Sequence, residues 1–395
     1  MIVGVVGYRF DHYSYIRNII DKVPGVDYRK AKDLFAYVNA GARTLNRLTN
    51  RVIISTFDLN NQFYDFNLNK VDLLHLFNGI SYGRIPWVST FETILPRFSN
   101  VVQRTPGSSP DFMSERKLRR AFDALASNRC KQIIAMSGCA ATMQSALLAE
   151  FSGYREVIES KLVVMHPPQA VLVSGFTDKH SDLGGRIKFM FVGNEFFRKG
   201  GRETVEAIKM LREQHHYDIE LTIVSALRID GYAVEANPED VQRMTAFFQD
   251  NCDWINYYPH LPNPEVLHLM KQAHIGLLPT YADSYGYSVL EFQASGCPVI
   301  STNVRALPEI NDNAKGWLIE VPKDRLGEAV YSTESDRLVL SEAIRTGLEE
   351  VIHEIFTDKS IIPIKSEQAI QSIKTNHSIE AFSSSMKQIY LNAIS

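Results

Sequence analysis

The sequence has few cysteines and no strong excess of either charge, and each shortage excludes a class of protein. Its four cysteines (Cys130, Cys139, Cys252 and Cys297) include no CxxC pair. A chain of 395 residues can bury a core without disulfides, so we expect a reducing, cytoplasmic compartment. The formal net charge is -3, so no overall basic field predicts a nucleic-acid partner.

Long apolar runs and two common motifs are also missing. No stretch approaches the roughly 18 to 20 apolar residues of a membrane-spanning helix, and the opening MIVGVVG has neither the basic residues nor the length of a signal peptide. The first turn, VVGYRFDHYS, lacks GxGxxG, which argues against a dinucleotide-dependent dehydrogenase. No Asp-x-Asp pair indicates a metal site. We therefore expect neither a metal ion nor a cofactor.

The sequence does contain two series of short, β-branched apolar runs that alternate with helical patterns. Runs of this kind predict parallel strands that are buried on both faces and connected as βαβ units. The first series comprises residues 2–6, 52–56, 73–77, 87–91, 133–137 and 162–165. The second series comprises residues 187–192, 220–224, 255–258, 275–279, 299–301 and 317–319.

A stretch rich in proline and glycine, residues 166–185, separates the two series as a linker would. We therefore predict an α/β protein with two doubly wound domains, over residues 1–170 and 186–355, and C-terminal helices over 356–395. The final helix packs either on the second domain or back on the first. Ligands of doubly wound folds sit beyond the carboxyl ends of the strands, so we expect the site in a cleft between the domains.

The stretch YADSYGYSVLEFQASGCPVIS, residues 281–301, carries the strongest functional pattern. It predicts a polar loop around Gly286 and a helix from Ser288. The amides at a helix start suit a diphosphate, and a glycine lets the backbone approach it closely. Glu291, one turn into the helix, can accept hydrogen bonds from ribose hydroxyls, and Asp283 could hold a sugar beyond the diphosphate. A purely structural strand–loop–helix is the alternative.

The same stretch resembles the signature of the family 4 glycosyltransferases of the GT-B fold. The family pattern is Glu–x7–Glu, a Leu-Glu-Ala-like run, a Gly-x-Pro-Val strand and a later Glu-Ile/Val. Here Asp283 and Glu291 are followed by FQASGCPVIS and by ALPEI at 306–310. In the family the first carboxylate contacts the transferred sugar, and an aspartate there leaves the sugar identity open. The resemblance implies two Rossmann-like domains facing across a cleft, and donor contacts at Gly286, Tyr287, Ser288, Val289 and Glu291.

Two further segments of the second domain resemble the family. FMFVGNEFFRKGG is similar to its Val-Gly-Arg…Lys-Gly segment: Lys199 matches the family lysine, while Asn194 stands at the arginine, for which Arg198 could substitute. Adjacent cations beside a helix start suit a diphosphate, although a solvated turn also explains them. INYYPHLPNPEVLHLM is similar to the segment that borders the nucleotide base, where the backbone near His260 could pair with a base edge. His260 is equally explained as a turn histidine.

The resemblance is weaker in the first domain. VDLLHLFNG is similar to the family's Asp-x-x-His-x-His-Asn strand end, with Phe77 at the second histidine. In STFETILPR, Glu92 stands at the histidine of a Thr-x-His pattern near the transferred sugar. Glu92 could bond a sugar hydroxyl or steady positive charge at the anomeric carbon, or it could be a salt-bridged surface residue. Gly7 stands where the family's glycine-rich loop begins, and the resemblance implies that it contacts the donor.

The resemblance implies a retaining, metal-independent glycosyltransferase that moves a hexose or related sugar from a nucleotide diphosphate-sugar to a saccharide or lipid-linked acceptor. Glu92 and Asp283 are the catalytic candidates. Arg198, Lys199 and the helix start can offset the charge of the leaving diphosphate. A non-catalytic nucleotide-sugar-binding protein of the same fold is the alternative, and a GT-B epimerase or phosphorylase is a third hypothesis.

The segment SERKLRR, residues 114–120, predicts a basic helix face. A solvated helix face is the ordinary explanation. The other is contact with anionic lipid headgroups, which would place the protein peripherally at the inner face of a membrane.

Overall fold

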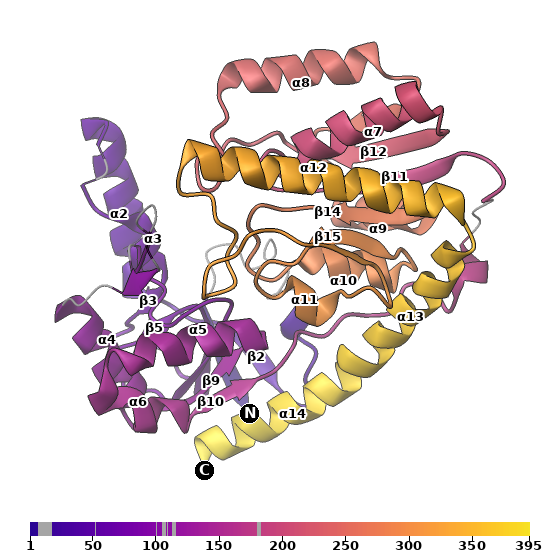
Figure 1. The fold of residues 1–395 in the computed structure, drawn as a ribbon. Coiled ribbons are helices and arrows are strands. Elements are labelled where there is room, and N and C mark those ends of the chain that lie inside the picture. Colours follow the sequence, from indigo (N-terminus) through magenta and orange to yellow (C-terminus); the bar gives the residue numbers. More distant parts are fainter. Residues whose placement is uncertain are drawn as a thin grey trace. The chain divides into compact units, whose positions relative to one another are not determined.

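The structure, a computed structural model, consists of two compact units (Figure 1). Unit 1 comprises Met1–Pro168 and Ile379–Ser395, and unit 2 comprises Gln169–Ser378. The last helix of the chain therefore belongs to unit 1. Of Arg116 and Lys117 only the backbone is described. The residues that the structure describes are 1–6, 18–51, 53–99, 101–104, 108, 110–112, 116–179 and 183–395.

Unit 1 is built on a six-stranded sheet in which all neighbouring strands are parallel. The strand order is β10-β9-β6-β4-β1-β2. Every residue of β4 and β6 is buried, as expected of continuous apolar runs in the middle of a parallel sheet. The strands are β1 (Ile2–Val5), β2 (Asp27–Lys30), β4 (Leu73–Phe77), β6 (Trp87–Phe91), β9 (Cys130–Ala135) and β10 (Leu162–Val164).

Helices flank this sheet, and α4, α5 and α14 all contact β9. Two short strand pairs lie outside the sheet: β3 (Gln62–Phe63) with β5 (Ile80–Ser81), and β7 (Val102–Gln103) with β8 (Asp111–Phe112). The helices of unit 1 are α2 (Leu34–Thr49), α3 (Thr56–Asn60), α4 (Arg116–Ala126), α5 (Gly138–Ala149), α6 (Ser152–Glu159) and α14 (Ile379–Ile394).

A buried chain of hydrogen bonds ties α14 to the sheet of unit 1. The Tyr390 hydroxyl lies 2.6 Å from Nδ1 of His75, whose Nε2 lies 2.8 Å from the hydroxyl of Thr90. The Tyr28 hydroxyl extends the chain, 3.3 Å from that of Tyr390. Complete burial lowers the pKa of His75 to about 3, so the ring is neutral and each ring nitrogen has a hydroxyl partner.

Unit 2 repeats the architecture with a second six-stranded parallel sheet. Its order is β13-β12-β11-β14-β15-β16, so the chain runs outward from β11 in one direction and then from β14 in the other. All residues of β14 and β15 are buried. The strands are β11 (Ile187–Val192), β12 (Ile219–Val224), β13 (Ile255–Tyr258), β14 (Ile275–Leu278), β15 (Val299–Thr302) and β16 (Trp317–Ile319).

The helices of unit 2 pack in pairs: α7 contacts α12, and α10 contacts both α9 and α13. Figure 1 shows α7, α8 and α12 together on one side of the sheet, with α9 and α10 on the other. Helices on both faces complete a doubly wound fold. They are η1 (Phe176–Asp178), α7 (Gly201–His215), α8 (Pro238–Asp250), α9 (Asn263–Gln272), α10 (Tyr287–Ala294), α11 (Leu307–Ile310), α12 (Glu334–Thr357) and α13 (Ile361–Asn376).

The predicted strand at residues 52–56 is wrong. Residues 53–55 are not in a strand and Thr56 begins α3, while residue 52 lies outside the described part. The edge strand of unit 1 is instead β2, whose sequence DYRK contains no apolar run. It forms because it pairs along its whole length with the buried β1. The other predicted strands are present, with ends that shift by up to three residues.

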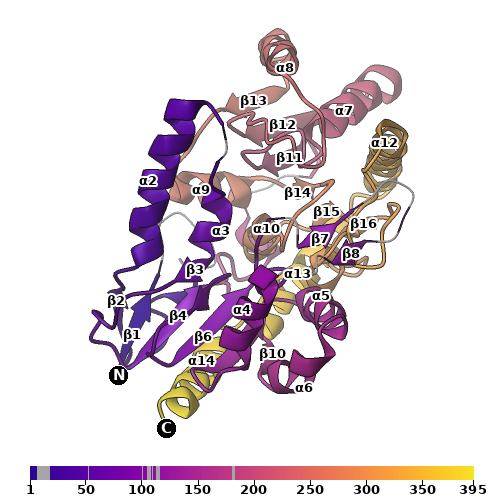
Figure 2. The same ribbon diagram turned by 90° about the vertical axis from the view of Figure 1, so that its left-hand side faces the viewer.

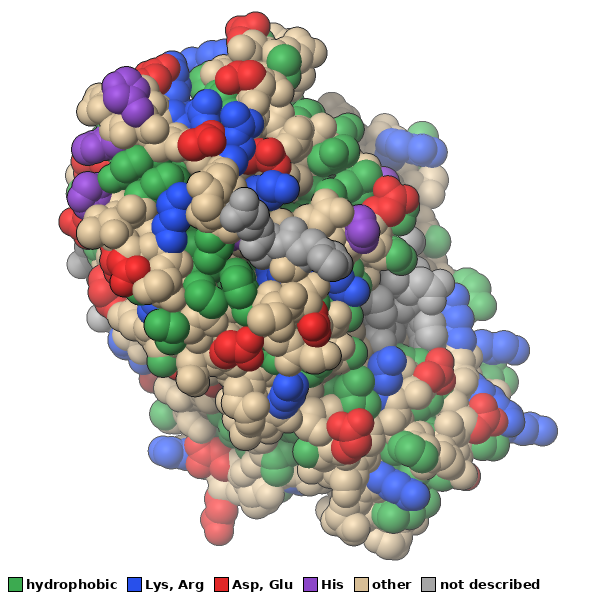
Figure 3. All heavy atoms as spheres, turned by 90° about the vertical axis from the view of Figure 1, so that its right-hand side faces the viewer, with side chains coloured by type: hydrophobic (Ala, Val, Ile, Leu, Met, Phe, Trp, Pro, Cys, Tyr) green, Lys and Arg blue, Asp and Glu red, His purple; other side chains and the backbone are tan. Residues whose placement is uncertain are grey.

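The surface carries charges of both signs. Figure 3 shows acidic and basic side chains interspersed over one face of the molecule. Among the described residues no helix is both long and apolar enough to cross a bilayer. The four cysteines are free thiols, and Cys130 and Cys297 are buried.

We predict that His75 keeps a neutral ring from about pH 8 to about pH 5, whereas an exposed histidine titrates near 6.5. Because its folded pKa is lowered, the unfolded chain binds this proton first, and stability falls as pH drops below about 6.5. NMR of protein labelled at the histidine ring carbons should show a non-titrating signal that is absent from His75→Gln. A His75 signal that titrates near 6.5 would refute the buried assignment.

Candidate functional site

The topology of unit 2 brings two loops together at one edge of its sheet. β11 and β14 are parallel neighbours, with Phe189 opposite Ile275 and Phe191 opposite Leu277. The chain leaves β11 towards β12 on one side and leaves β14 towards β15 on the other. The loops that follow these two strands, residues 193–200 and 279–286, therefore lie at the switch point where doubly wound sheets bind ligands.

One carboxylate connects the two loops. Oδ2 of Asp283 accepts a hydrogen bond of 2.9 Å from the Lys199 ammonium group. Oδ1 of the same side chain accepts from the backbone amides of Tyr285, at 3.2 Å, and Gly286, at 3.0 Å. Burial opposes ionisation of Asp283, but the charge and hydrogen bond of Lys199 outweigh it and hold the pKa below its usual value. An ionised aspartate thus joins the ammonium group to the N-cap of α10.

Glycines allow these loops to pack closely. A Cβ on Gly193 would lie 2.2 Å from Cδ of Lys199, so the missing side chain leaves room for the lysine stem. Gly200 has a φ of +78°, and a Cβ there would lie 2.0 Å from the carbonyl oxygen of Pro279. Any residue with a side chain at position 193 or 200 would therefore clash with the neighbouring atoms.

The start of α10 has the properties of an anion site. Its N-cap is Gly286, with a φ of 93°, a residue that has no side chain with which to cap the helix. The Ser288 hydroxyl is shielded from solvent and makes no hydrogen bond to any described residue. Val289 is fully buried, while Tyr287 and Ser288 are partly exposed. The helix dipole places partial positive charge here, beside the Lys199–Asp283 pair.

Glu291 lies on the next turn of α10 and is 8% exposed. Its Oε1 accepts a 3.3 Å hydrogen bond from Nδ2 of Asn263, the first residue of α9. Asn263 therefore orients the carboxylate and links it to the segment that contains His260. His260 itself is exposed, three residues before α9.

Arg198 holds the loop before α10 in place. Its carbonyl accepts from the amide of Tyr281 at 2.9 Å, and its guanidinium donates to the carbonyl of Ala282 at 2.6 Å. It also forms ion pairs with Asp230 and, at 3.4 Å, with Glu195. Burial disfavours the charge, but the bond to Asp230 outweighs burial and raises the pKa of Arg198. Arg198 thus contacts three protein acceptors, Asp230, Glu195 and the Ala282 carbonyl, whereas Lys199 uses one of its three N–H groups in the Asp283 pair.

Two predicted site residues, Glu92 and Gly7, belong to unit 1 and are far in sequence from the cluster in unit 2. Glu92 pairs with Arg97 at 3.0 Å, its side chain is 13% exposed, and its amide donates to Oδ1 of Asn78. The salt bridge agrees with the structural alternative for Glu92 and leaves its role in catalysis a proposal. Gly7 lies outside the described residues.

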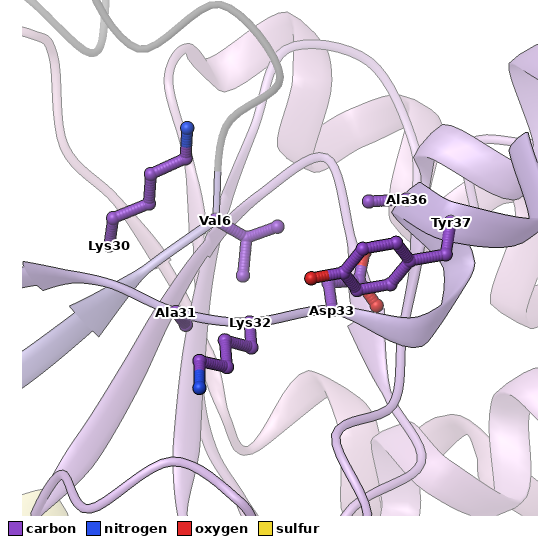
Figure 4. A pocket seen from close by; sticks show the side chains of 7 residues that line it. All are labelled: Val6, Lys30, Ala31, Lys32, Asp33, Ala36 and Tyr37. Carbon is purple, nitrogen blue, oxygen red and sulfur yellow. The ribbon is translucent and has the colours of Figure 1, made fainter. Parts of the chain in front are cut away.

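Unit 1 has a cavity of about 390 Å³ beyond the ends of β1 and β2 (Figure 4). Asp33 caps α2 there, because its carboxylate accepts from the amides of Phe35 and Tyr64. Figure 4 shows the Tyr37 hydroxyl pointing across the cavity towards Val6. The ammonium groups of Lys30 and Lys32 make the lining of the cavity basic. The lining residues are Val6, Lys30, Ala31, Lys32, Asp33, Ala36 and Tyr37.

The structure thus unites Lys199, Asp283, Gly286 and Ser288 in one cluster, with Glu291 one turn further along. Asp230 and Asn263, which orient Arg198 and Glu291, were not singled out in the sequence. Asn263 has a signal, the first helical position of a segment that resembles the family, but Asp230 lies in an irregular loop without one. No set of three acidic, histidine or cysteine side chains in the described part of the chain is placed to hold a metal ion.

We predict that Gly200→Ala destabilises unit 2 by at least about 2 kcal/mol, because alanine disfavours a positive φ and its Cβ would strike the Pro279 carbonyl. Gly185→Ala is the control, since no atom lies within 4 Å of the added Cβ. It should change stability by less than about 0.5 kcal/mol. Denaturant unfolding measures both. Equal stabilities of the two variants would contradict the close contact between the loops.

Comparison with known proteins gives a family match within unit 2. Residues 176–349 match the family model described as "Glycosyl transferases group 1". A curated relative, the D-inositol 3-phosphate glycosyltransferase of Arthrobacter sp. (strain FB24), is 30% identical over 139 residues. That alignment covers 34% of this chain and 31% of the relative. The chain thus matches about a third of the length of this relative.

Solved structures extend the likeness to the whole chain. A glycosyltransferase from Rickettsia africae ESF-5 superposes with a TM-score of 0.59 at 14% identity, covering 100% of this chain and 98% of its own. Anabaena HepE, solved with UDP and glucose, superposes with a TM-score of 0.57 at 12% identity, covering 98% of each. The predicted class, two Rossmann-like doubly wound domains, is confirmed. The chain has the GT-B fold, and its residues 176–349 are similar to the group 1 glycosyl transferases, which is consistent with the family 4 resemblance.

Proposed function

We propose that this protein is a glycosyltransferase that moves a sugar from a nucleotide diphosphate-sugar to an acceptor, with retention of configuration and without a metal ion. One observation carries the proposal. The Asp283 carboxylate joins the Lys199 ammonium group to the N-cap of α10, beside a Ser288 hydroxyl that has no partner among the described residues. A cation, a helix start and an unused hydroxyl together suit an anionic diphosphate.

The diphosphate would lie at the start of α10. Lys199 has two N–H groups beyond the Asp283 pair, and the Ser288 hydroxyl can donate a further hydrogen bond. Gly286, Tyr287 and Val289 supply the backbone of this turn. Arg198 contributes its charge from behind the loop, since its donors are engaged by Asp230 and by the Ala282 carbonyl. As the donor bond breaks, these groups offset the charge on the leaving diphosphate.

The nucleoside would lie along α10 and the start of α9. Glu291 can accept hydrogen bonds from both ribose hydroxyls, and its bond to Asn263 fixes its orientation. The segment around His260 precedes Asn263, which supports its assignment to the base. We propose UDP as the first nucleotide to test, because the similar Anabaena protein was solved with UDP and glucose.

The transferred sugar is assigned to Asp283, and Glu92 of unit 1 is the second catalytic candidate. Asp283 already binds Lys199 and two amides, so a sugar hydroxyl would share an oxygen with them. We assign acceptor binding to residues 1–170 and donor binding to residues 186–355, and we propose Gly7 as a further donor contact from the first domain. The basic cavity at Lys30 and Lys32 supports an acceptor site in unit 1. A saccharide or a lipid-linked sugar is the proposed acceptor.

The proposed location is the cytoplasm, with peripheral contact at the inner face of a membrane. The four free cysteines support a reducing compartment. The mixed surface charge supports the absence of a nucleic-acid partner.

The second candidate function is a nucleotide-sugar-binding protein without catalysis, favoured by the pairing of Asp283 with Lys199 and of Glu92 with Arg97. A transfer assay with UDP-, GDP- and ADP-sugars separates the two.

We predict that Glu291→Ala lowers kcat/KM for transfer by roughly 100-fold or more, because two hydrogen bonds to a charged acceptor are lost. Glu265→Ala is the matched control, since Glu265 is an exposed acid on α9. Thermal unfolding should show that both variants fold. A folded Glu291→Ala with near-normal transfer activity would place the ribose elsewhere.

We predict that Lys199→Ala raises the Kd for free UDP by roughly tenfold or more, because a charge-assisted bond to phosphate is removed. Lys199→Arg, which keeps the charge, should retain more of the affinity. The control is Lys209→Ala, since Lys209 is 45% exposed on α7 and pairs only loosely with Glu213, at 3.8 Å. Titration calorimetry measures all three, and an unchanged affinity in Lys199→Ala would refute the phosphate role.

A further inference from the structure

Two amphipathic helices of unit 1 differ in what covers their apolar faces. In α4 the apolar residues Leu118, Ala121, Phe122 and Leu125 are at most 1% exposed, while Arg119, Arg120 and Asp123 are exposed. In α2, a helix of 16 residues, the only buried residues are Asn39 and Ala42. Of its apolar residues, Ala42 is buried and Leu34, Phe35 and Ala36 are half-buried, whereas the larger ones further along the helix are exposed.

The uncovered apolar residues of α2 form one stripe. Val38 and Leu45 are seven residues apart, and Tyr37 and Leu48 are eleven apart, spacings that return to the same side of a helix. Leu48 is 77% exposed and Tyr37 is 70% exposed. Figures 1 and 2 both show α2 extending away from the sheet of unit 1, with α3 beside it. The stripe therefore faces solvent along the helix.

The turn after α2 adds two more exposed apolar residues, and hydrogen bonds hold it rigidly. Oδ1 of Asn46 accepts from the amides of Ile53, at 2.9 Å, and Ile54, at 3.2 Å, and its Nδ2 donates to the Ile54 carbonyl at 2.9 Å. Ile53 is 57% exposed. Because the Asn46 side chain makes three hydrogen bonds to the backbone of Ile53 and Ile54, it holds these two isoleucines in their exposed positions. We call the residues Tyr37, Val38, Leu45, Leu48, Ile53 and Ile54 the α2 surface.

The charge around this surface is of one sign. Residues 34–57 contain Arg43, Arg47 and Arg51 and no acidic residue, although the whole chain carries a net charge of -3. The flanking acids, Asp33 and Asp58, are buried, and their carboxylates accept from the backbone amides of Phe35 and Ser99. All three arginines are exposed; Arg43 donates to Oδ1 of Asn39 at 3.2 Å, a neutral acceptor that leaves its charge uncompensated. The segment is thus basic and apolar at once.

We propose that the α2 surface docks on an anionic lipid bilayer, with the apolar stripe among the acyl chains and the arginines near the headgroups. An apolar helix face of this kind is typical of a helix that lies in a membrane interface, and exposed apolar patches mark interaction sites. The three exposed positive charges favour an anionic bilayer over a neutral one. This deepens the proposed peripheral contact and assigns it to α2 rather than to the basic face of residues 114–120.

Docking would also bring a cavity to the lipid headgroups. Tyr37 belongs to the α2 surface and lines the basic cavity at Lys30 and Lys32 (Figure 4). A membrane-bound acceptor would then present its polar group next to that cavity. The inference does not depend on catalysis, because vesicle binding is measured without donor or acceptor.

The test is cosedimentation of the full chain with vesicles of phosphatidylcholine alone or mixed with phosphatidylglycerol. We expect binding to the anionic vesicles that falls with added salt. Leu48→Ser/Ile53→Ser should lower the partition coefficient by roughly tenfold or more. Arg43→Gln/Arg47→Gln should lower it by roughly fivefold for each arginine.

Two controls separate this surface from others. Leu338→Ser/Val339→Ser removes a matched pair from α12, 65% and 54% exposed, and Arg119→Gln tests the α4 face. Neither should change vesicle binding by more than roughly twofold, and all variants should keep the UDP affinity of the wild type. The proposal is overturned if the wild type binds no anionic vesicles or if a control variant loses binding equally. It is also overturned if light scattering shows a dimer that Leu48→Ser/Ile53→Ser dissociates while vesicle binding is absent.

Discussion

The ion pair between Lys199 and Asp283 is the interaction on which the site in unit 2 depends. The two side chains are only 16% and 14% exposed, so solvent screens them less than a surface pair. Loss of one partner from a buried pair costs about 3–5 kcal/mol, because the other charge stays buried alone. The pair therefore fixes the loop after β11 to the loop after β14. It also keeps one ammonium group and the start of α10 beside each other before any ligand arrives.

This arrangement follows from the topology of the sheet and from small residues at the crossing points. Because β11 and β14 are neighbours, Lys199 and Asp283 meet although they are 84 residues apart in the sequence. Gly193 and Gly200 leave the space in which the lysine stem and the Pro279 carbonyl meet the loop. A preorganised cation of this kind can stabilise a leaving diphosphate without reorganisation during the reaction.

Much of the fold could be predicted from the sequence because parallel strands buried on both faces leave a clear signal. The runs at 73–77, 87–91, 187–192, 255–258 and 317–319 match β4, β6, β11, β13 and β16 residue for residue. β2 could not be predicted, because its DYRK sequence is held by pairing with β1 and not by its own apolarity. The lack of cover over the α2 stripe is likewise invisible in a pattern that ordinarily predicts burial. Tertiary packing decided both.

The candidate site was predicted in part. Asp283, Gly286 and Glu291 stand in one stretch with a recognisable spacing, and the structure adds the bond that joins Asp283 to Lys199. The partners of Arg198 and Glu291 could not be predicted, because Asp230 and Asn263 lie in other segments and reach the site only through the fold. In both pairs, Arg198 with Asp230 and Glu291 with Asn263, the sequence pattern identified the first residue but not its partner.

The most direct measurement is a crystal structure of the protein with UDP. The account predicts the diphosphate oxygens within hydrogen-bond distance of the Lys199 ammonium group and the Ser288 hydroxyl, and the ribose hydroxyls on Glu291. A nucleotide bound elsewhere, with these three side chains unoccupied, would contradict it.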